Sequence, residues 1–473
     1  MSDEAARFDV LVVGGGPAGT KAAVQAAKAG RRVGLVEREA HIGGECVHRG
    51  TIPSKTLRET ASCLSGLRKR SGGLLGLDAG VGVEVDSLMT RLKSVLAHEE
   101  RYLADQLARN GIEQLTGVAR FRSPSTLEVV RRAGGKTLVQ AGIVVIATGS
   151  RPRSPASVPV DHEHVLDSDS ILSLRYLPRS LVVLGGGVIA CEFASIFAAL
   201  GTEVTLVEKR DRPLGFLDRS LTDRFVAAFE SDGGRFLAGA SVESVRWDGM
   251  SRVVTRLADG SVLCSEKLLC ALGRVANVAA LDLAAAGLAL DERGLVPVDE
   301  HYRTAVPHVY AVGDVIGPPA LAATGMSQGR LAVRHALGLE SEGAPEVIPI
   351  GIYTIPEIAS VGESERQVTD RLGGAIVGRA QFDEIARAHI NGSTDGLLEL
   401  VCDPEGRRVL GAQAIGEGAC DLVHLAQLAI HAGLEVDAFL ENVFNFPTLA
   451  EAYRVAALDV GGRRARLGGS RAA

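Results

Sequence analysis

Two segments of the chain combine a glycine-rich loop with an acidic residue at the same distance downstream. The two sets are Gly14-x-Gly16-x-x-Gly19 with Glu37, and Gly185-x-Gly187-x-x-Ala190 with Glu208. Small residues let the backbone turn sharply and let a pyrophosphate lie against helix N-terminal N–H groups, while the acid accepts hydrogen bonds from ribose hydroxyls. One such loop is weakly diagnostic, but two matched copies predict two dinucleotide-binding sites.

Both glycine loops lie within a predicted strand–helix–strand unit. Each loop follows a short apolar strand, opens an apolar helix and is followed by a second strand that leads to the acid. The predicted strands are Phe8–Val13, Arg32–Val36, Leu181–Leu184 and Glu203–Val207, with helices running to about Ala29 and Leu200. This repeated strand–helix–strand order predicts two Rossmann-like domains.

Two adjacent nucleotide sites indicate two cofactors that react with each other. A flavin and a nicotinamide are the natural pair, because hydride passes directly between them. Glu208 favours the free 2′-hydroxyl of NAD, whereas the next residues, Lys209 and Arg210, suit the 2′-phosphate of NADP. The alternative is that both cations are solvated surface residues, and the sequence leaves both interpretations open.

The composition disfavours several other classes. The 473 residues carry a formal charge of −6 with a pI near 6.0, which argues against nucleic acid or an anionic membrane surface as a partner. Apolar runs are too short to span a bilayer, and the charged start, Met1 to Arg7, is unlike a signal peptide. Seven cysteines without a C-x-x-C pair suit a reducing cytoplasm and predict no metal site.

The remaining segments complete the predicted domains. Three prolines make Arg151 to Pro159 a linker, Ala141 to Ala147 is a buried-type strand, and Leu295 to Asp314 is strand-like. Beyond about Glu346, short strands precede amphipathic helices, as in an α+β domain. Those strands are Leu397–Cys402 and Val409–Ile415, and the helices are Glu417–Ala432 and Thr448–Leu458.

We therefore expect an α/β protein with two Rossmann-like domains and a C-terminal α+β domain. The first nucleotide-binding domain comprises residues 1–150 and 281–345, and the second comprises residues 151–280. The α+β domain comprises residues 346–473, with a flexible, frayed tail from about residue 461.

Several short motifs resemble those of the flavoprotein disulfide reductases, such as glutathione reductase and dihydrolipoamide dehydrogenase, over nearly the whole chain. Besides the glycine loops they are the segment from Gly43 to Lys55, Ala147-Thr148-Gly149, Gly273-Arg274, Ala311-Val312-Gly313-Asp314 and Pro447-Thr448-Leu449-Ala450-Glu451. The resemblance implies FAD in the first site and NAD(P) in the second. It also implies that the C-terminal domain forms a homodimer.

The resemblance further implies roles for individual residues. Lys55 would lie beside flavin N5 and pair with Glu192, because a cation there stabilises the negative charge of reduced flavin. Asp314 would hold the ribityl chain, and the backbone near Ala322 would face the flavin O2 edge. The other implied FAD-binding residues are Gly14, Gly16, Gly19, Glu37, Arg38, Gly43, Gly44, Glu45, Cys46, Gly117, Ala147, Thr148 and Gly149. Those implied for the nicotinamide nucleotide are Gly185, Gly187, Ala190, Glu208, Lys209, Arg210, Gly273 and Arg274.

Three positions depart from the reductase pattern. In the segment that corresponds to Gly43–Lys55, the family's reductases have two cysteines in a C-x4-C pattern. Here the first position is Cys46, but the second is Thr51, whose hydroxyl forms no disulfide. Phe446 stands where the family has a proton-shuttling histidine. Glu45 is an acid where a small or uncharged residue is more usual, and because it would repel pyrophosphate we expect it to point outward. Cys46 could pair with Cys63, but we expect a packed, inert thiol.

Without the dithiol, electrons must leave the flavin to a second nicotinamide, to oxygen or to a quinone. The loop variant and the Phe-Pro-Thr ending resemble the soluble, Si-specific pyridine nucleotide transhydrogenases, which implies ping-pong hydride transfer between NADPH and NAD⁺. The alternatives are an NAD(P)H diaphorase or quinone reductase, a reductase relying on Cys46 alone or Cys63, and a dihydrolipoamide-dehydrogenase-like scaffold subunit. The resemblance also predicts a cis Phe446–Pro447 bond and a structural Glu451 that bonds across the subunit interface.

Overall fold

A seven-stranded sheet forms the first nucleotide-binding region of the computed structural model, which describes residues 5–71, 85–132, 134–340 and 343–470. The sheet order is β3-β2-β1-β6-β5-β4, with β17 also paired to β6. The strands are β1 (Ala6–Val13), β2 (Val33–Glu37), β3 (Glu113–Thr116), β4 (Val118–Ser123), β5 (Thr126–Val130), β6 (Lys136–Ile146) and β17 (Val309–Ala311). The strand β6 is long enough to pair in parallel with β1 and β17 and antiparallel with β5.

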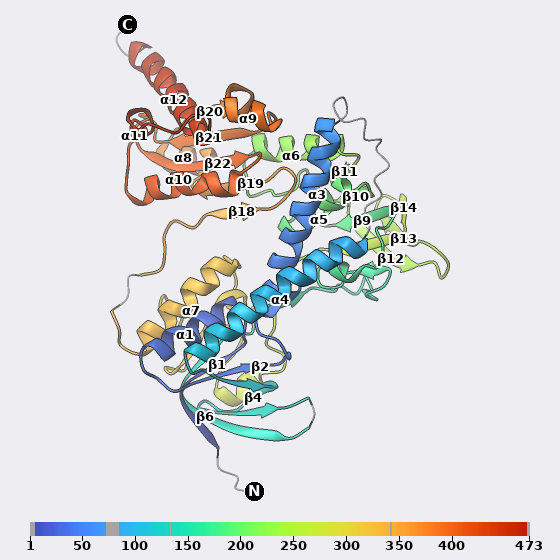
Figure 1. Cartoon of the computed structure of the whole chain (residues 1–473), viewed down its shortest axis with the longest axis vertical. Helices are drawn as coiled ribbons and strands as arrows, with labels where there is room; N and C mark the ends of the chain where they lie inside the picture. Colours follow the sequence, from blue (N-terminus) through green and yellow to red (C-terminus); the bar gives the residue numbers. More distant parts are fainter. Residues whose placement is uncertain (1–4, 72–84, 133, 341–342, 471–473) are drawn as a thin grey trace.

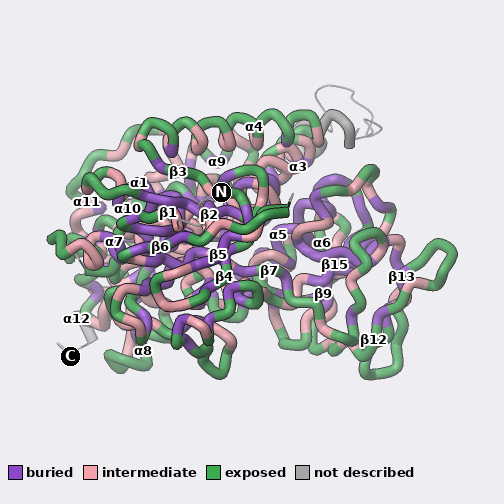
Figure 2. Tube along the Cα trace, turned by 90° about the horizontal axis from the view of Figure 1, so that it is seen from below, coloured by how far each residue is buried: buried purple, intermediate pink, exposed green. Residues whose placement is uncertain are grey.

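Helices α1 (Pro17–Lys28), α7 (Ala322–Ala336) and α4 (Val85–Arg109) pack on this region, at the bottom of Figure 1. The helices α1 and α7 approach closely, because a Cβ on Gly329 would lie 2.2 Å from the carbonyl oxygen of Ala18. Figure 2 shows β2 and the carboxyl-terminal parts of β1 and β6 as buried segments, with α4 along the exposed outer edge. The carboxyl end of β1 and the start of α1 are thereby fixed between packed layers.

A second, five-stranded parallel sheet lies to the right in Figure 1, in the order β11-β10-β9-β15-β8. These strands are β8 (Val165–Leu166), β9 (Ser180–Leu184), β10 (Glu203–Val207), β11 (Arg235–Leu237) and β15 (Lys267–Cys270), with helices α5 (Val188–Ala199) and α6 (Arg219–Ser231). A three-stranded sheet packs on it, formed by β12 (Val242–Trp247), β13 (Val253–Leu257) and β14 (Val262–Ser265). A two-stranded ribbon of β7 (Ser150–Pro152) and β16 (Arg274–Ala276) carries the chain into and out of this region.

The C-terminal region contains a five-stranded sheet in the order β18-β19-β22-β21-β20. Its strands are β18 (Ile350–Ile352), β19 (Ile358–Gly362), β20 (Ile376–Gln381), β21 (Leu397–Cys402) and β22 (Val409–Ile415). Its helices are α8 (Glu365–Leu372), α9 (Ala386–Asn391), α10 (Ala419–His431), α11 (Ala438–Glu441) and α12 (Glu451–Ser470). Helix α3 (Thr51–Ser71), preceded by the short α2 (Gly44–His48), contacts α5 of the second region and reaches this one through Arg58.

Two sequence expectations about secondary structure were wrong. The segment expected to be strand-like from Leu295 contains only β17, because Asp291 and Asp299 each accept hydrogen bonds from backbone N–H groups two and four residues ahead and so fold the chain into turns. The tail expected to fray from about residue 461 instead continues α12, where Arg463 pairs with Asp459 and Arg464 with Asp437. Residues 471–473 of that tail, like residues 1–4 at the charged start, lie outside the described residues.

Across the described ranges, no helix combines the length and apolarity needed to cross a membrane. In the same part of the chain, no cluster of three or more histidine, cysteine or acidic side chains is arranged to hold a metal ion.

Candidate functional site

The first glycine loop connects β1 to α1, and the Glu37 side chain hydrogen-bonds to its backbone. The Glu37 carboxylate, at the end of β2, accepts hydrogen bonds from the backbone N–H of Gly15 at 2.7 Å and of Glu39 at 3.0 Å. Gly14 has a φ of 111°, and a Cβ on Gly19 would lie 1.9 Å from the carbonyl oxygen of Gly14. Only glycine fits at these two positions, so the loop brings the N-terminus of α1 to the sheet edge.

Other segments predicted to bind FAD gather around this loop. A Cβ on Gly44 would lie 2.9 Å from the Cα of Gly16, so the Gly43–Gly44 turn packs directly on the loop. Gly117 donates its backbone N–H to the carbonyl of Glu37, and Ala322 is the first residue of α7. The hydroxyl of Thr148 is buried and has no hydrogen-bond partner within the described structure. This set fits a dinucleotide, because glycine cradles, two helix N-termini and an unpaired hydroxyl converge there.

Glu45 does not point outward as expected. Its Oε1 pairs with Arg49 at 3.3 Å and with Arg38 at 3.9 Å, and its Oε2 is buried without a hydrogen-bond partner in the described chain. The physical reason is that the two arginines of the same loop neutralise the acid locally. The Arg38 side chain is held by its ion pair with Glu45 and by a second ion pair, in which its Nε lies 3.5 Å from the Glu39 Oε1.

A chain of hydrogen bonds leads from Arg274 through Ser150 to Asp314. Ser150 donates its hydroxyl to Asp314 at 2.6 Å, and Arg274 donates its Nε to the same Ser150 hydroxyl at 2.7 Å. Arg274 also donates to Ser168 and lies 3.9 Å from Asp169. The structure thus uses Arg274, predicted to bind NAD(P), to join the β7–β16 ribbon to the second nucleotide-binding region. Sequence reasoning missed Ser150, because no local pattern links it to a residue so distant in the chain.

Lys55 and Glu192 form an ion pair, as predicted. The Lys55 Nζ lies 2.7 Å from the Glu192 Oε2, with 24% of the lysine side chain and 5% of the glutamate side chain exposed. The other Glu192 oxygen accepts the backbone N–H of Tyr353 at 2.9 Å. The Lys55 Nζ also lies 4.9 Å from the centroid of the Tyr353 ring. Tyr353, which follows β18, is a site residue that the sequence did not reveal, because it reaches the pair from the C-terminal region.

Cys46 and Thr51 face each other where the family's reductases have two cysteines. Cys46 lies on α2 and Thr51 begins α3, and the Thr51 hydroxyl is within hydrogen-bonding reach of the thiol. Burial raises the pKa of the Cys46 thiol above its usual 9.0, which outweighs the opposing effects of Thr51 and Lys55. Cys63 is also a free, exposed thiol. This environment keeps Cys46 a neutral thiol rather than a reactive thiolate.

Phe446 lies in the C-terminal region with 75% of its surface exposed in the single chain. The Phe446–Pro447 bond is cis, which confirms the prediction. Glu451 accepts a weak hydrogen bond from the Thr448 N–H at 3.4 Å, and its contact across a subunit interface stays a prediction.

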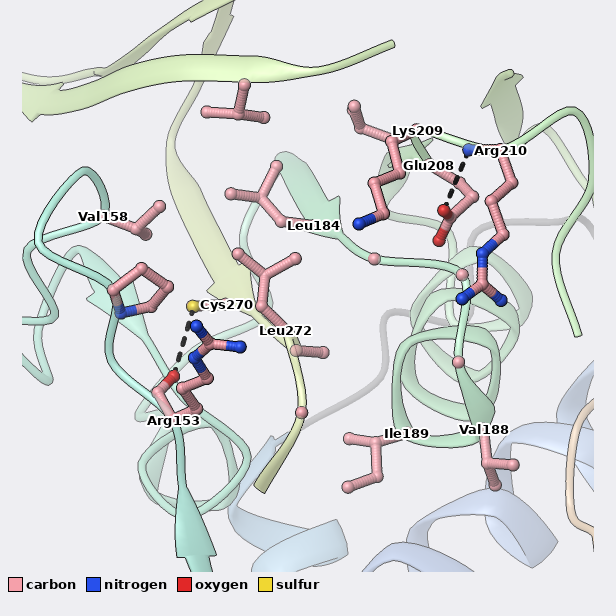
Figure 3. A pocket seen from close by; sticks show the side chains of 18 of the residues that line it. Arg153, Val158, Leu184, Val188, Ile189, Glu208, Lys209, Arg210, Cys270 and Leu272 are labelled. Carbon is pink, nitrogen blue, oxygen red and sulfur yellow. Dashed lines mark hydrogen bonds between the residues drawn. The ribbon is translucent and has the colours of Figure 1, made fainter. Parts of the chain in front are cut away.

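A pocket of about 680 Å³ covers the second glycine loop, at the carboxyl ends of β9, β10 and β15. Gly185 has a φ of 106°, and the Glu208 Oε1 accepts the Arg210 N–H at 3.0 Å. Figure 3 shows Glu208, Lys209 and Arg210 on one side of this pocket, with Arg153 and Cys270 opposite. Gly187 and Gly273 also line the pocket, whereas Ala190 is buried within α5 and Arg274 is not among the lining residues.

The chain has close relatives among known proteins. The soluble pyridine nucleotide transhydrogenase of Mycobacterium tuberculosis (strain ATCC 25177 / H37Ra) is 43% identical over 456 residues, covering 96% of this chain and 97% of the relative. The protein of the same name from Vibrio vulnificus (strain YJ016) is 40% identical over 459 residues, with the same coverage.

Two solved structures have the same fold. LpdA from Mycobacterium tuberculosis superposes with a TM-score of 0.88 at 27% identity, covering 96% of this chain and 99% of that one. The Cu(II) complex of the HOCl-induced flavoprotein disulfide reductase RclA from Escherichia coli superposes with a TM-score of 0.87 at 27% identity and the same coverage.

Family models account for almost the whole chain. The pyridine nucleotide-disulphide oxidoreductase model matches residues 8–329, and the dimerisation-domain model of the same family matches residues 348–457. Together with the two glycine loops and the α/β architecture that surrounds them, these matches identify the chain as a member of the pyridine nucleotide-disulphide oxidoreductase family.

Proposed function

We propose that this protein is an FAD-dependent NAD(P)⁺ transhydrogenase that transfers hydride between NADPH and NAD⁺ without a redox-active disulfide. The single observation that carries the proposal is the pairing of Cys46 with Thr51 beside an intact Lys55–Glu192 ion pair. The chain has lost the dithiol that passes electrons onward but keeps the residues that serve hydride transfer. The names of the mycobacterial and Vibrio relatives support the same activity.

The first site would bind FAD through the α1 N-terminus, Glu37, Asp314 and the α7 N-terminus. FAD held there would supply the chemistry of reversible hydride transfer with nicotinamide nucleotides. Lys55 would place a cation beside the N5 of bound FAD, and the contacts of its ammonium group with Glu192 and with the Tyr353 ring hold the lysine in place. The Phe446 side chain has no titratable group, so it cannot act as an acid or a base at the position where the family's reductases have a histidine.

The second site would bind both nicotinamide nucleotides in turn. Glu208 suits the ribose hydroxyls of NAD(H), and Lys209 and Arg210 suit the 2′-phosphate of NADP(H). This edge of the pocket would therefore accept either nucleotide. Because one pocket receives both donor and acceptor, the first product must leave before the acceptor enters. This order predicts ping-pong kinetics. The match to a dimerisation domain supports a homodimer.

The proposal is tested by anaerobic steady-state assays of the purified FAD-loaded enzyme with NADPH as donor. Thionicotinamide adenine dinucleotide in its oxidised form serves as the acceptor, because its reduction is visible apart from NADPH oxidation. We expect rapid reduction of this analogue and parallel lines in double-reciprocal plots. Rapid reduction of a quinone without reduction of the analogue would contradict the proposal and support the quinone reductase alternative.

A further inference from the structure

A strap of the chain, residues 209–217, leaves the end of β10 and returns over the second glycine loop. Leu214 anchors the strap: it is buried, and its backbone N–H donates to the carbonyl of Gly186 at 2.7 Å. Leu214 has a φ of 49°, in the left-handed region that a leucine adopts only when its surroundings fix it. The strap is therefore held in one conformation against the part of the loop that faces the nucleotide.

The strap presents an aromatic side chain to the pocket. Phe216 lines the pocket and is 55% exposed, and Phe216 and Phe446 are the only exposed phenylalanines in the described part of the chain. The aromatic content of the whole sequence is only 4%. An exposed aromatic ring on the wall of a ligand pocket is typical of a residue that binds a flat ligand surface.

The neighbours of Phe216 place it at the adenosine end of the pocket. Arg212 donates to the carbonyl of the adjacent Gly215 at 3.1 Å, and a Cβ on Gly215 would lie 3.7 Å from an Arg210 nitrogen. Arg210 in turn donates its backbone N–H to Glu208, the acid that suits the adenosine ribose. The same pocket is lined by Val188 and Ile189 at the start of α5, the helix that carries Glu192. The nicotinamide would extend toward that helix, so Phe216 would lie on the side of the adenine ring.

We propose that Phe216 is the stacking platform for the adenine ring of both NAD(H) and NADP(H). The two nucleotides differ only at the 2′ position, where Glu208 and the cations Lys209 and Arg210 favour opposite partners. Binding energy taken from the shared adenine ring does not depend on that difference, and cation–π contacts from Arg210 or Arg212 of the strap would add to it for both nucleotides. This inference rests on the proposed function for its reason, since an enzyme that uses both nucleotides needs affinity common to both.

The test compares Phe216→Ala, Phe216→Tyr and wild-type holoenzyme. Isothermal titration calorimetry gives the Kd of NAD⁺ and NADP⁺, and anaerobic flavin reduction gives the saturation constant of reduced nicotinamide mononucleotide, which lacks the adenosine half. We expect Phe216→Ala to weaken NAD⁺ and NADP⁺ by the same factor, roughly tenfold. Binding of the mononucleotide should be unchanged, and Phe216→Tyr should restore dinucleotide binding to within about threefold.

Met250→Ala is the matched control, because Met250 is an 87% exposed apolar residue of the same region that does not line the pocket. This control should leave all three constants unchanged. Unchanged dinucleotide binding in Phe216→Ala, a loss for NADP⁺ alone, or an equal loss for the mononucleotide would each overturn the proposal. Because calorimetry needs no acceptor reaction, failure of transhydrogenation in the wild type remains distinguishable from failure of the stacking role.

Discussion

Replacing Lys55 by methionine removes the cation from the Lys55–Glu192 pair and keeps most of the side-chain volume. At 2.7 Å and an effective dielectric constant of about 20, the direct attraction is about 6 kcal/mol. Desolvation offsets much of it, and the 24% exposure of the lysine side chain screens the rest. We therefore expect the variant to lose about 2–3 kcal/mol of unfolding free energy, because the buried Glu192 carboxylate would keep, among the described residues, the Tyr353 N–H as its remaining partner. We also expect flavin reduction by NADPH to slow about 100-fold.

Urea unfolding and anaerobic stopped-flow absorbance measure the two effects separately. The double variant Lys55→Met/Glu192→Gln removes both charges, and its amide can still accept the Tyr353 N–H. It should recover stability to within about 1 kcal/mol of the wild type while remaining slow. Recovery of the rate in the double variant, or a single variant within about threefold of the wild-type rate, would refute a role of this cation in hydride transfer.

Three further predictions concern Thr51, Cys46 and Asp169. Thr51→Cys should form a disulfide with Cys46, so that oxidation removes two thiols from a thiol titration; an unchanged count would contradict the geometry. Because burial raises the pKa of the Cys46 thiol, iodoacetamide should modify it slowly at pH 7 and faster above pH 9, and rapid labelling at pH 7 in peptide mapping would argue otherwise. Burial also raises the pKa of Asp169 to about 6, so the folded state should lose stability as the pH rises from about 4 to 6. Asp169→Asn should abolish that loss. In urea unfolding, its free energy of unfolding relative to the wild type should therefore rise by about 1–2 kcal/mol between pH 4 and 7, after allowance for solvent screening. Parallel pH profiles of the two proteins would disprove this prediction.

The sequence alone predicted the features whose conformation depends on residues of a single segment. The glycine loops specify their own turns, as the steric limit at Gly19 and the positive φ of Gly185 illustrate. The strands Leu397–Cys402 and Val409–Ile415 were predicted with the bounds that the structure gives them. The Lys55–Glu192 pair was predicted by resemblance alone, because no local pattern relates α3 to α5.

Contacts between domains set the limit of prediction. The Tyr353 N–H that holds Glu192 comes from the C-terminal region, and the Ser150–Arg274 link joins segments far apart in the chain. Glu45 was expected to avoid a pyrophosphate, yet arginines of its own loop neutralise it. The first two features depend on contacts between distant segments, which neither periodicity nor residue spacing encodes. The Glu45–Arg49 pair has the i,i+4 spacing of a helical ion pair, and the sequence expectation overlooked it.

The most direct test of the central claim is a pair of anaerobic half-reactions followed by flavin absorbance. NADPH is mixed with the oxidised holoenzyme, the released nucleotide is removed, and NAD⁺ is then added as the sole acceptor. We predict that NADPH bleaches the flavin and that NAD⁺ restores its absorbance while a stoichiometric amount of NADH appears. A reduced enzyme that NAD⁺ fails to reoxidise, but that a disulfide or a quinone reoxidises at once, would contradict the account.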